Sequence, residues 1–284
     1  MWVVYLRVLW ALASLLVVFL LVSVITNSVV LWRVWSLLGD QEFYMAVSLA
    51  LYYLHPSPST ALLVLLSVVF SGSLNVYFKY WLRLPRPPDP LVHVEGPGFP
   101  SGHAQVSTSF WTTLSSAARE QALYLVSAVV LSGVSLSRVY LRAHYPLDVV
   151  GGVLLGLFCG LAVFASTRLL GYMGSALCAV ASTAVSLLAL LVLGAPSDTC
   201  SVLVATSLAL LLLYAVSWRR GFKPPVISAP LRVSLLALSM VVILAAHTTT
   251  RGADFAARTL AMLFSTLFAL GSPLVIGFLR FRAR

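Results

Sequence analysis

The stretch PLDVVGGVLLGLFCGLAVFASTR, residues 146–168, opens with Pro146 and Asp148 and continues almost to its end with apolar and small residues. A helix that crosses a bilayer needs roughly 17–25 residues of this kind, so the stretch predicts a transmembrane helix. Proline fits the first turn of a helix, and we therefore expect this one to begin near Pro146. The acid at its start places a polar group at a membrane surface.

Similar apolar stretches recur along the whole chain of 284 residues, which is 60% hydrophobic and only 9% charged. A soluble domain carries about 25% charged residues, so this chain needs lipid as its solvent. Backbone groups in hydrocarbon must pair within their own segment, and the sequence therefore predicts an all-α, polytopic transmembrane helical bundle. We expect ten segments, of which the second and fourth are short for a full span, at about 5–27, 41–55, 60–78, 102–117, 121–140, 146–168, 172–193, 199–217, 231–249 and 256–279.

Two breaks rich in proline separate these segments, at 79–101 and 218–230. The apolar stretch from Val8 to Val24 is long for a signal peptide and no small-residue cleavage site follows it, so we expect a retained helix. The three cysteines lack any metal-binding spacing, and we interpret them as packing residues. Gly152, Gly156 and Gly160 form a stripe that permits close helix packing, either inside the chain or at a dimer face.

Polar side chains gather in three clusters, each at the end of an expected helix. They are KYWLRLPRP (79–87), PSGH (100–103) and SRVYLRAHYPLD (137–148). The chain leaves the second cluster by one helix and returns by the next to the third, and the first cluster directly precedes the second. All three clusters therefore lie on the same membrane face and can converge.

The residue types in these clusters suit a phosphate group. Lys79, Arg86 and Arg138 are cationic donors, and a planar guanidinium binds two oxygens at once. Ser101 and Gly102 stand at the start of a helix, where free backbone N–H groups favour an anion. We therefore expect these five residues to bind phosphate.

Two histidines supply the groups that a phosphoryl transfer requires. His144 and His103 offer a nucleophile and a general acid near neutral pH. Asp148 follows His144 by four residues, the spacing that puts both on one helix face, where the carboxylate can orient the imidazole. A metal site on these histidines is disfavoured because no carboxylate-rich set of ligands accompanies them.

The combined pattern Lys-x6-Arg-Pro, Pro-Ser-Gly-His and Ser-Arg-x5-His-x3-Asp resembles that of the type 2 phosphatidic acid phosphatase superfamily, which includes vanadium-dependent haloperoxidases. The resemblance covers about residues 35–168 and is closest to the membrane lipid phosphatases. It implies a six-helix core, a phosphohistidine on His144, leaving-group protonation by His103, and phosphate binding by Lys79, Arg86, Ser101, Gly102 and Arg138. It implies no metal ion and no cofactor.

These expectations divide the chain into a lipid phosphatase core, 1–170, and about four additional C-terminal helices of unassigned role, 171–284. The expected partners are a lipid phosphate or diphosphate and the surrounding membrane lipids, not nucleic acid. The rival is a lipid-binding or transport protein that uses the same anion pocket. A peroxidase is disfavoured because the haloperoxidases of the family are soluble.

Further charges near the clusters have a plainer interpretation. We expect Asp40 and Glu42 in an exposed loop, although contact with the site is the alternative. Arg83, Arg142 and His93 are expected to anchor helices at the membrane surface rather than touch substrate. With a cytoplasmic N-terminus and ten spans, ten of the 18 basic residues face the cytoplasm. The positive-inside rule then predicts an extracytoplasmic site in a multi-pass cell-membrane protein.

Overall fold

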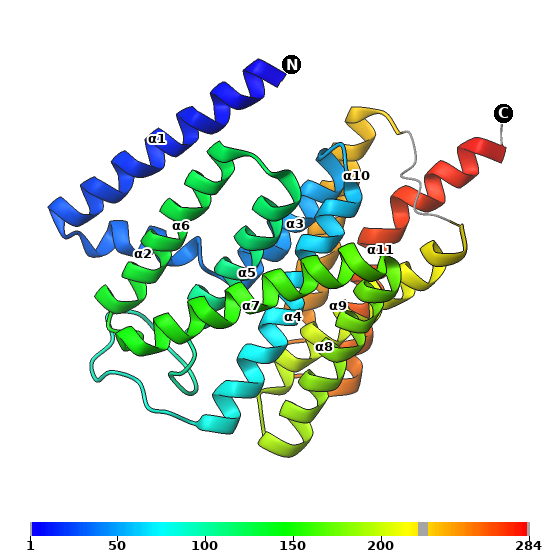
Figure 1. Cartoon of the computed structure of the whole chain (residues 1–284). Coiled ribbons are helices and arrows are strands. Elements are labelled where there is room, and N and C mark those ends of the chain that lie inside the picture. Colours follow the sequence, from blue (N-terminus) through cyan, green and yellow to red (C-terminus); the bar gives the residue numbers. More distant parts are fainter. Residues whose placement is uncertain (1, 221–226, 283–284) are drawn as a thin grey trace.

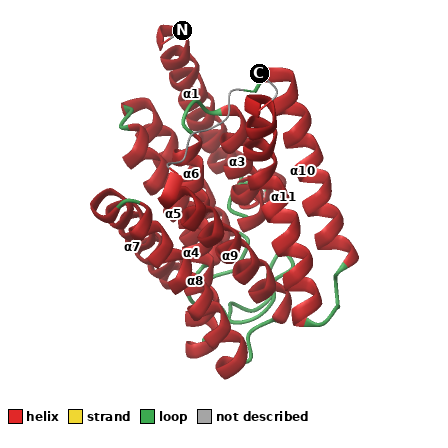
Figure 2. Cartoon of the chain, turned by 90° about the vertical axis from the view of Figure 1, so that its right-hand side faces the viewer, coloured by secondary structure: helices red, strands yellow, loops and turns green. Residues whose placement is uncertain are grey.

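The computed structural model describes residues 2–220 and 227–282, and within these ranges it consists of helices and connecting loops, with no strand (Figures 1 and 2). The predicted all-α class is confirmed. The helices are α1 (Trp2–Thr26), α2 (Val29–Leu37), α3 (Gln41–Leu54), α4 (Pro58–Leu82), α5 (Gly102–Ala118), α6 (Gln121–Tyr140), α7 (Pro146–Leu170), α8 (Tyr172–Leu193), α9 (Ser197–Arg220), α10 (Ala229–Thr249) and α11 (Phe255–Arg282).

Ten of these helices correspond to the ten expected segments, and α7 begins at Pro146 as predicted. The break expected at 79–101 is confirmed with a shorter extent, because α4 continues to Leu82 and Lys79 lies in its last turn. Part of the second expected break, residues 221–226, lies outside the described residues.

Helix α2 is the element that the sequence did not predict. Its nine residues are too short to cross a membrane at about 1.5 Å per residue. It is held by Trp32 and Trp35, which pack with residues of α1 and α6. The ring of Trp35 lies so close to Gly133 that a Cβ there would fall 2.2 Å from it, and its indole N–H donates to Ser23. Helix α2 therefore fixes the chain between α1 and α3.

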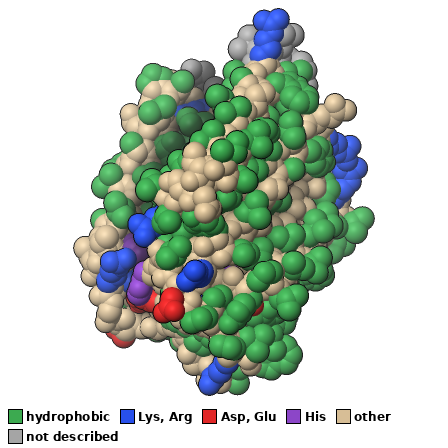
Figure 3. Space-filling view, turned by 90° about the vertical axis from the view of Figure 1, so that its left-hand side faces the viewer, with side chains coloured by type: hydrophobic (Ala, Val, Ile, Leu, Met, Phe, Trp, Pro, Cys, Tyr) green, Lys and Arg blue, Asp and Glu red, His purple; other side chains and the backbone are tan. Residues whose placement is uncertain are grey.

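Eight helices in the described part of the chain are long and apolar enough to cross a membrane. Helices α3 and α5, with 14 and 17 residues, are shorter. Helix α3 begins beside Asp40, which contacts His103, and ends next to the start of α4, so it connects the two ends of α4. Large apolar side chains face outward on α1, α7 and α10, and Figure 3 shows one such face. The chain is a multi-pass membrane protein.

The glycine stripe of α7 packs against α5. A Cβ at Gly152, Gly156 or Gly160 would lie 2.6, 2.3 or 2.8 Å from backbone oxygens of Ser101, Gln105 and Ser109, respectively. The interpretation as packing inside the chain is confirmed, and the alternative of a dimer face is wrong for this stripe. The close approach holds the start of α5 beside the start of α7.

The C-terminal helices share a hydrophobic core with the N-terminal ones. Residues of α8, α9, α10 and α11 form one buried cluster with residues of α3 and α4. Tyr52 and Tyr53 on α3 donate hydrogen bonds to the carbonyls of Leu270 and Ala269 on α11, at 2.7 and 2.6 Å. All three cysteines are buried and free, as their interpretation as packing residues requires. The division at residue 170 stays a prediction.

Candidate functional site

The three polar clusters meet at one end of the bundle, where α4 ends and α5 and α7 begin. The Ser101 N–H donates to the Asp148 carbonyl at 2.9 Å, joining the second cluster to the third. Arg86 Nη1 lies 3.1 Å from His144 Nε2, joining the first to the third. In Figure 3 histidine, basic and acidic side chains gather near one edge of a largely apolar face. The predicted convergence is thus present in the fold.

The hydrogen bond at Nε2 assigns the tautomer of His144, because Nδ1 has no hydrogen-bond partner among the described residues. Arginine has donors only, so Arg86 Nη1 donates to Nε2 of His144 and Nε2 is an acceptor. The proton of the neutral ring is then on Nδ1, which lies 3.5 Å from Asp148 Oδ2. Such contacts are often long in structures without substrate. The free electron pair of the ring faces the arginine, where an anion would bind.

Asp148 is fixed by the start of α7. Its Oδ2 accepts the backbone N–H of Tyr145, the N-cap residue, at 2.9 Å. This contact is half of a capping box, which helices use to satisfy their free N–H groups. The carboxylate is buried, and its hydrogen bond at the helix start fixes its position.

The surroundings of His144 keep its ring neutral. Burial lowers the pKa of His144, and the nearby cations Lys79, Arg86 and Arg138 lower it further. A buried imidazole loses the hydration that stabilises its charged form, and adjacent positive charges oppose protonation. The ring is therefore in the form that a nucleophile requires.

Lys79 and Arg86 are held by backbone carbonyls of the loop between α4 and α5 and, for Arg86, also of the connection between α6 and α7. Lys79 Nζ donates to the carbonyls of Pro97 and Gly98, at 2.7 and 3.3 Å. Arg86 donates from Nε to Gly96 and from Nη2 to Glu95, at 2.9 and 2.8 Å, and from Nη1 to Ala143 at 2.8 Å. These carbonyls fix both cations, and Arg86 is thereby held in contact with His144.

Arg138 and Ser101 retain donors with no hydrogen-bond partner among the described residues. These are Arg138 Nε and the Ser101 hydroxyl, both fully buried. The Nη1 group of Arg138 donates to the hydroxyl of Ser36 on α2. Buried polar groups in native proteins are normally satisfied, so orphaned donors in a cationic site suit an anionic ligand.

Buried amide side chains form hydrogen bonds that support the start of α5. Ser101 is the N-cap residue and Gly102 the first helical residue, as predicted. Asn75 Nδ2 donates to the Pro100 carbonyl at 3.2 Å and to Gln105 Oε1 at 2.8 Å. A Cβ at Gly102 would approach Asn75 Oδ1 to 3.1 Å, so glycine permits this close contact. These hydrogen bonds therefore fix the position of the first turn of α5 relative to α4.

His103 lies beside an acid that the sequence left in a loop. Its Nε2 is 2.8 Å from Asp40 Oδ1, and both side chains are partly exposed. The expectation of an exposed loop without contact is therefore wrong for Asp40. The structure gives no such contact for Glu42, which lies in the first turn of α3.

Sequence reasoning missed three residues that touch the predicted ones, and it gave Asp40 only as an alternative contact. Ser36 lies in α2, and Asn75 and Gln105 are polar residues inside apolar helices. The available signals were the closely spaced tryptophans at 32 and 35 and the amides within predicted spans. Buried polar residues in a membrane helix mark a site or a partner more often than chance.

The hydrogen bonds of the Arg83 and His93 side chains go to residues other than the converging ones, in line with the expectation. Arg83 donates to the carbonyl of Leu193 at 2.9 Å, which ties α4 to the end of α8. His93 pairs with Glu95, and both side chains are 84% exposed. Among the described residues, no three His, Cys, Asp or Glu side chains come together as a metal site would need.

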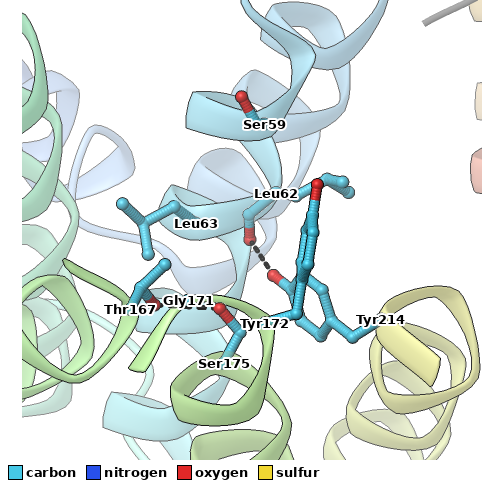
Figure 4. Close-up of a pocket in the computed structure, with 8 residues that line it drawn as sticks. All are labelled: Ser59, Leu62, Leu63, Thr167, Gly171, Tyr172, Ser175 and Tyr214. Carbon is cyan, nitrogen blue, oxygen red and sulfur yellow. Dashed lines mark hydrogen bonds between the residues drawn. The ribbon is translucent and has the colours of Figure 1, made fainter. Parts of the chain in front are cut away.

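An apolar pocket of about 230 Å³ lies elsewhere, between α4, α7, α8 and α9 (Figure 4). Its lining includes Leu62 and Leu63 near the start of α4, whereas Lys79 is near the end of that helix. At 1.5 Å per residue, 16 residues place the two roughly 24 Å apart. The pocket is therefore separate from the converging polar clusters.

Comparison with known proteins identifies the region that carries the site. Residues 60–172 match the family model described as PAP2 superfamily. The chain is 33% identical over 106 residues to Phosphatidylglycerophosphatase B of Bacillus subtilis (strain 168), covering 34% of this chain and 52% of that protein. It is 29% identical over 133 residues to Bacitracin transport permease protein BcrC of Bacillus licheniformis, covering 43% and 64%.

A solved structure is also similar, that of the first transmembrane PAP2 type phosphatidylglycerolphosphate phosphatase from Bacillus subtilis. It matches 59% of this chain and 94% of its own, at 24% identity and a TM-score of 0.45. The chain spans about half the length of the first of the two curated relatives. The resemblance to the type 2 phosphatidic acid phosphatase superfamily is confirmed for residues 60–172.

Proposed function

Because residues 60–172 of this membrane protein are a PAP2 superfamily region, we propose that the chain hydrolyses phosphate monoesters or diphosphates of lipids through a phosphohistidine on His144. The observation that carries the proposal is the state of His144. Its Nε2 accepts from Arg86 while its Nδ1 faces Asp148. The imidazole is neutral, with an orienting carboxylate on its Nδ1 side and cations on its Nε2 side. Such a ring can attack phosphorus through Nε2.

In the first step, Nε2 of His144 attacks phosphorus and the bond to the lipid oxygen breaks. His103 gives a proton to the departing oxygen, and Asp148 stabilises the charge that develops on the His144 ring. Lys79, Arg86 and Arg138 hold the phosphoryl oxygens, together with the Ser101 hydroxyl and the N–H groups at the start of α5.

In the second step, a water molecule attacks the phosphorus of the phosphohistidine. Neutral His103 takes a proton from this water, the P–N bond breaks, and its electron pair returns to Nε2. Inorganic phosphate leaves and both histidines regain their starting states. The positive side chains do the charge neutralisation that other phosphatases assign to divalent cations, so no metal ion takes part.

The position of the site favours a lipid substrate. The groups lie at the ends of apolar helices, with exposed Leu147 and Val150 on α7 next to Asp148. A phosphate at headgroup depth reaches the cations while its hydrocarbon tail stays among such side chains. The relative named Phosphatidylglycerophosphatase B supports including phosphatidylglycerol phosphate in the substrate class, beside phosphatidate and polyprenyl diphosphate.

The test is phosphate release by purified protein from a panel of these lipids and from glucose phosphate. Lipid phosphates should have the higher kcat/KM, and His144→Ala should abolish turnover. His93→Ala is the matched control, because this histidine is exposed and pairs with Glu95. Equal turnover of the soluble sugar phosphate would refute the lipid class.

A lipid-binding or transport role is the alternative, and the relative named as a transport permease gives it support. Binding alone needs no nucleophile with an orienting acid. Binding of lipid phosphate without any phosphate release, in wild type as in His144→Ala, would favour that alternative and refute the proposed hydrolysis.

A further inference from the structure

The segment 36–40, which comprises the end of α2 and the link to α3, contacts the site at two places. Asp40 Oδ1 lies 2.8 Å from Nε2 of His103, and Ser36 accepts a hydrogen bond from Arg138. The link is tightly wound, since the Gly39 N–H donates to the Ser36 carbonyl at 2.8 Å and the Asp40 N–H donates to that of Leu37 at 3.3 Å. One short segment thus holds both a histidine and an arginine of the site.

The fit around His103 leaves little freedom. A Cβ at Gly39 would lie 2.9 Å from the Cβ of His103, which is shorter than real contacts of this kind. The backbone of the link therefore passes directly over the histidine. Packing of Trp35 against Gly133 fixes the link in turn. The Asp40 carboxylate is held where it meets the ring.

The charges that face His103 are otherwise positive. Lys79 on α4 and Arg138 on α6 act on it, and His144 lies in the connection between α6 and α7. Positive neighbours and burial both disfavour an imidazolium. Asp40 is the acid in direct contact with the ring, and its charge favours the protonated form that a general acid requires.

We propose that Asp40 is a positioning residue that orients His103 and favours its protonated form for its reaction with the leaving group. The inference rests on the proposed function and deepens it. Asp40 itself gives up and takes up no proton in this cycle. His103 loses one proton to the departing oxygen and regains one from the attacking water, so no further reactant is needed.

The test replaces Asp40 by Asn, which is as good an N-cap for α3 as Asp. Turnover of a lipid phosphate, with its poor alkoxide leaving group, should fall about 10- to 100-fold, since general acids typically contribute 10²–10⁴-fold. Turnover of nitrophenyl phosphate, whose leaving group needs little proton donation, should change less than about threefold in its phosphorylation step.

The pH profile supplies a readout that a merely structural role would not move. His103 acts when protonated, and Asp40 stabilises that form. The basic limb of kcat/KM should therefore shift to lower pH in Asp40→Asn, and Asp40→Glu should move it back toward wild type. Glu42→Gln is the matched control, because it removes the same charge two residues further along the chain. It should leave both limbs of the pH profile in place.

The inference would be overturned if Asp40→Asn lost turnover equally with both substrates and kept its basic limb in place. Unchanged lipid turnover in this variant would also overturn it. If Asp40→Asn does not fold, judged by its unfolding temperature, the profile of Asp40→Ser decides, because serine is also a good N-cap and, without a carboxylate, should again shift the basic limb to lower pH. Failure of the proposed function is distinct: His144→Ala would then retain lipid turnover. Failure of the inference alone leaves His144→Ala and His103→Ala inactive on lipid.

Discussion

Substitution of Gly156 by alanine tests whether the α5–α7 contact positions the site. The added Cβ would lie 2.3 Å from the Gln105 carbonyl oxygen and 2.7 Å from Thr108 Cβ. Real Cβ contacts are essentially never below 3.0 Å, so the two helices must separate by about 0.7 Å at this point. The obstacle is largely backbone, which no side-chain rotation relieves.

This separation of α5 from α7 should displace the site residues that the two helices carry. Gln105 lies two residues after His103, and Ser101 at the start of α5 meets the Asp148 carbonyl on α7. A misplacement of about 1 Å can cost about 100-fold in rate, so we expect a loss of roughly 10- to 100-fold in kcat/KM. Overpacking of this kind should also lower the free energy of unfolding by about 1–3 kcal/mol.

The assay is lipid phosphate release in detergent micelles, with thermal unfolding followed in parallel. Gly271→Ala is the matched control, because this glycine lies inside α11 and a Cβ there meets nothing within 4 Å. Alanine should stabilise that helix by up to about 1 kcal/mol and leave activity unchanged. Full activity in Gly156→Ala would refute the role of the α5–α7 contact in positioning the site.

Three further predictions concern the chemistry and the orientation of the site. Turnover should survive EDTA and be inhibited by vanadate, because Lys79, Arg86 and Arg138 supply the positive charge; complete loss on chelation, restored by magnesium, would contradict this. Because burial and the neighbouring cations lower the pKa of His144, its ring should still be neutral at pH 5.5 in an NMR titration of labelled histidine, whereas protonation near the ordinary value of about 6.5 would count against it. In intact cells, His93→Cys should react with an impermeant thiol reagent while the buried native cysteines stay silent, and labelling only after lysis would reverse the predicted topology.

The sequence predicted the long helices and the converging motifs for the same reason. Apolar stretches of membrane-spanning length are a strong signal, and polar residues are so few that their positions at helix ends stand out. The starts of α5 at Gly102 and of α7 at Pro146 follow from local residues alone. Ten of the eleven described helices were therefore predictable, with small differences at their ends.

The rest depends on contacts between distant segments. Helix α2 has only nine residues, and it is stabilised by packing of Trp35 on Gly133 and not by its own length. The contact of Asp40 with His103 joins positions 63 residues apart, and nothing in the sequence pairs them. Likewise, the glycine stripe of α7 was compatible with two partners until the structure placed α5 against it.

The central claim is that His144 carries the phosphoryl group during turnover, and trapping that intermediate tests it most directly. Purified protein would be mixed rapidly with nitrophenyl phosphate, quenched, and analysed by mass spectrometry for phosphohistidine. We predict acid-labile phosphate on His144, in larger amount in His103→Ala because the second step then lacks its base, and none in His144→Ala. Phosphate that stays on the protein in His144→Ala, or no trapped phosphate in His103→Ala despite nitrophenol release, would contradict the account.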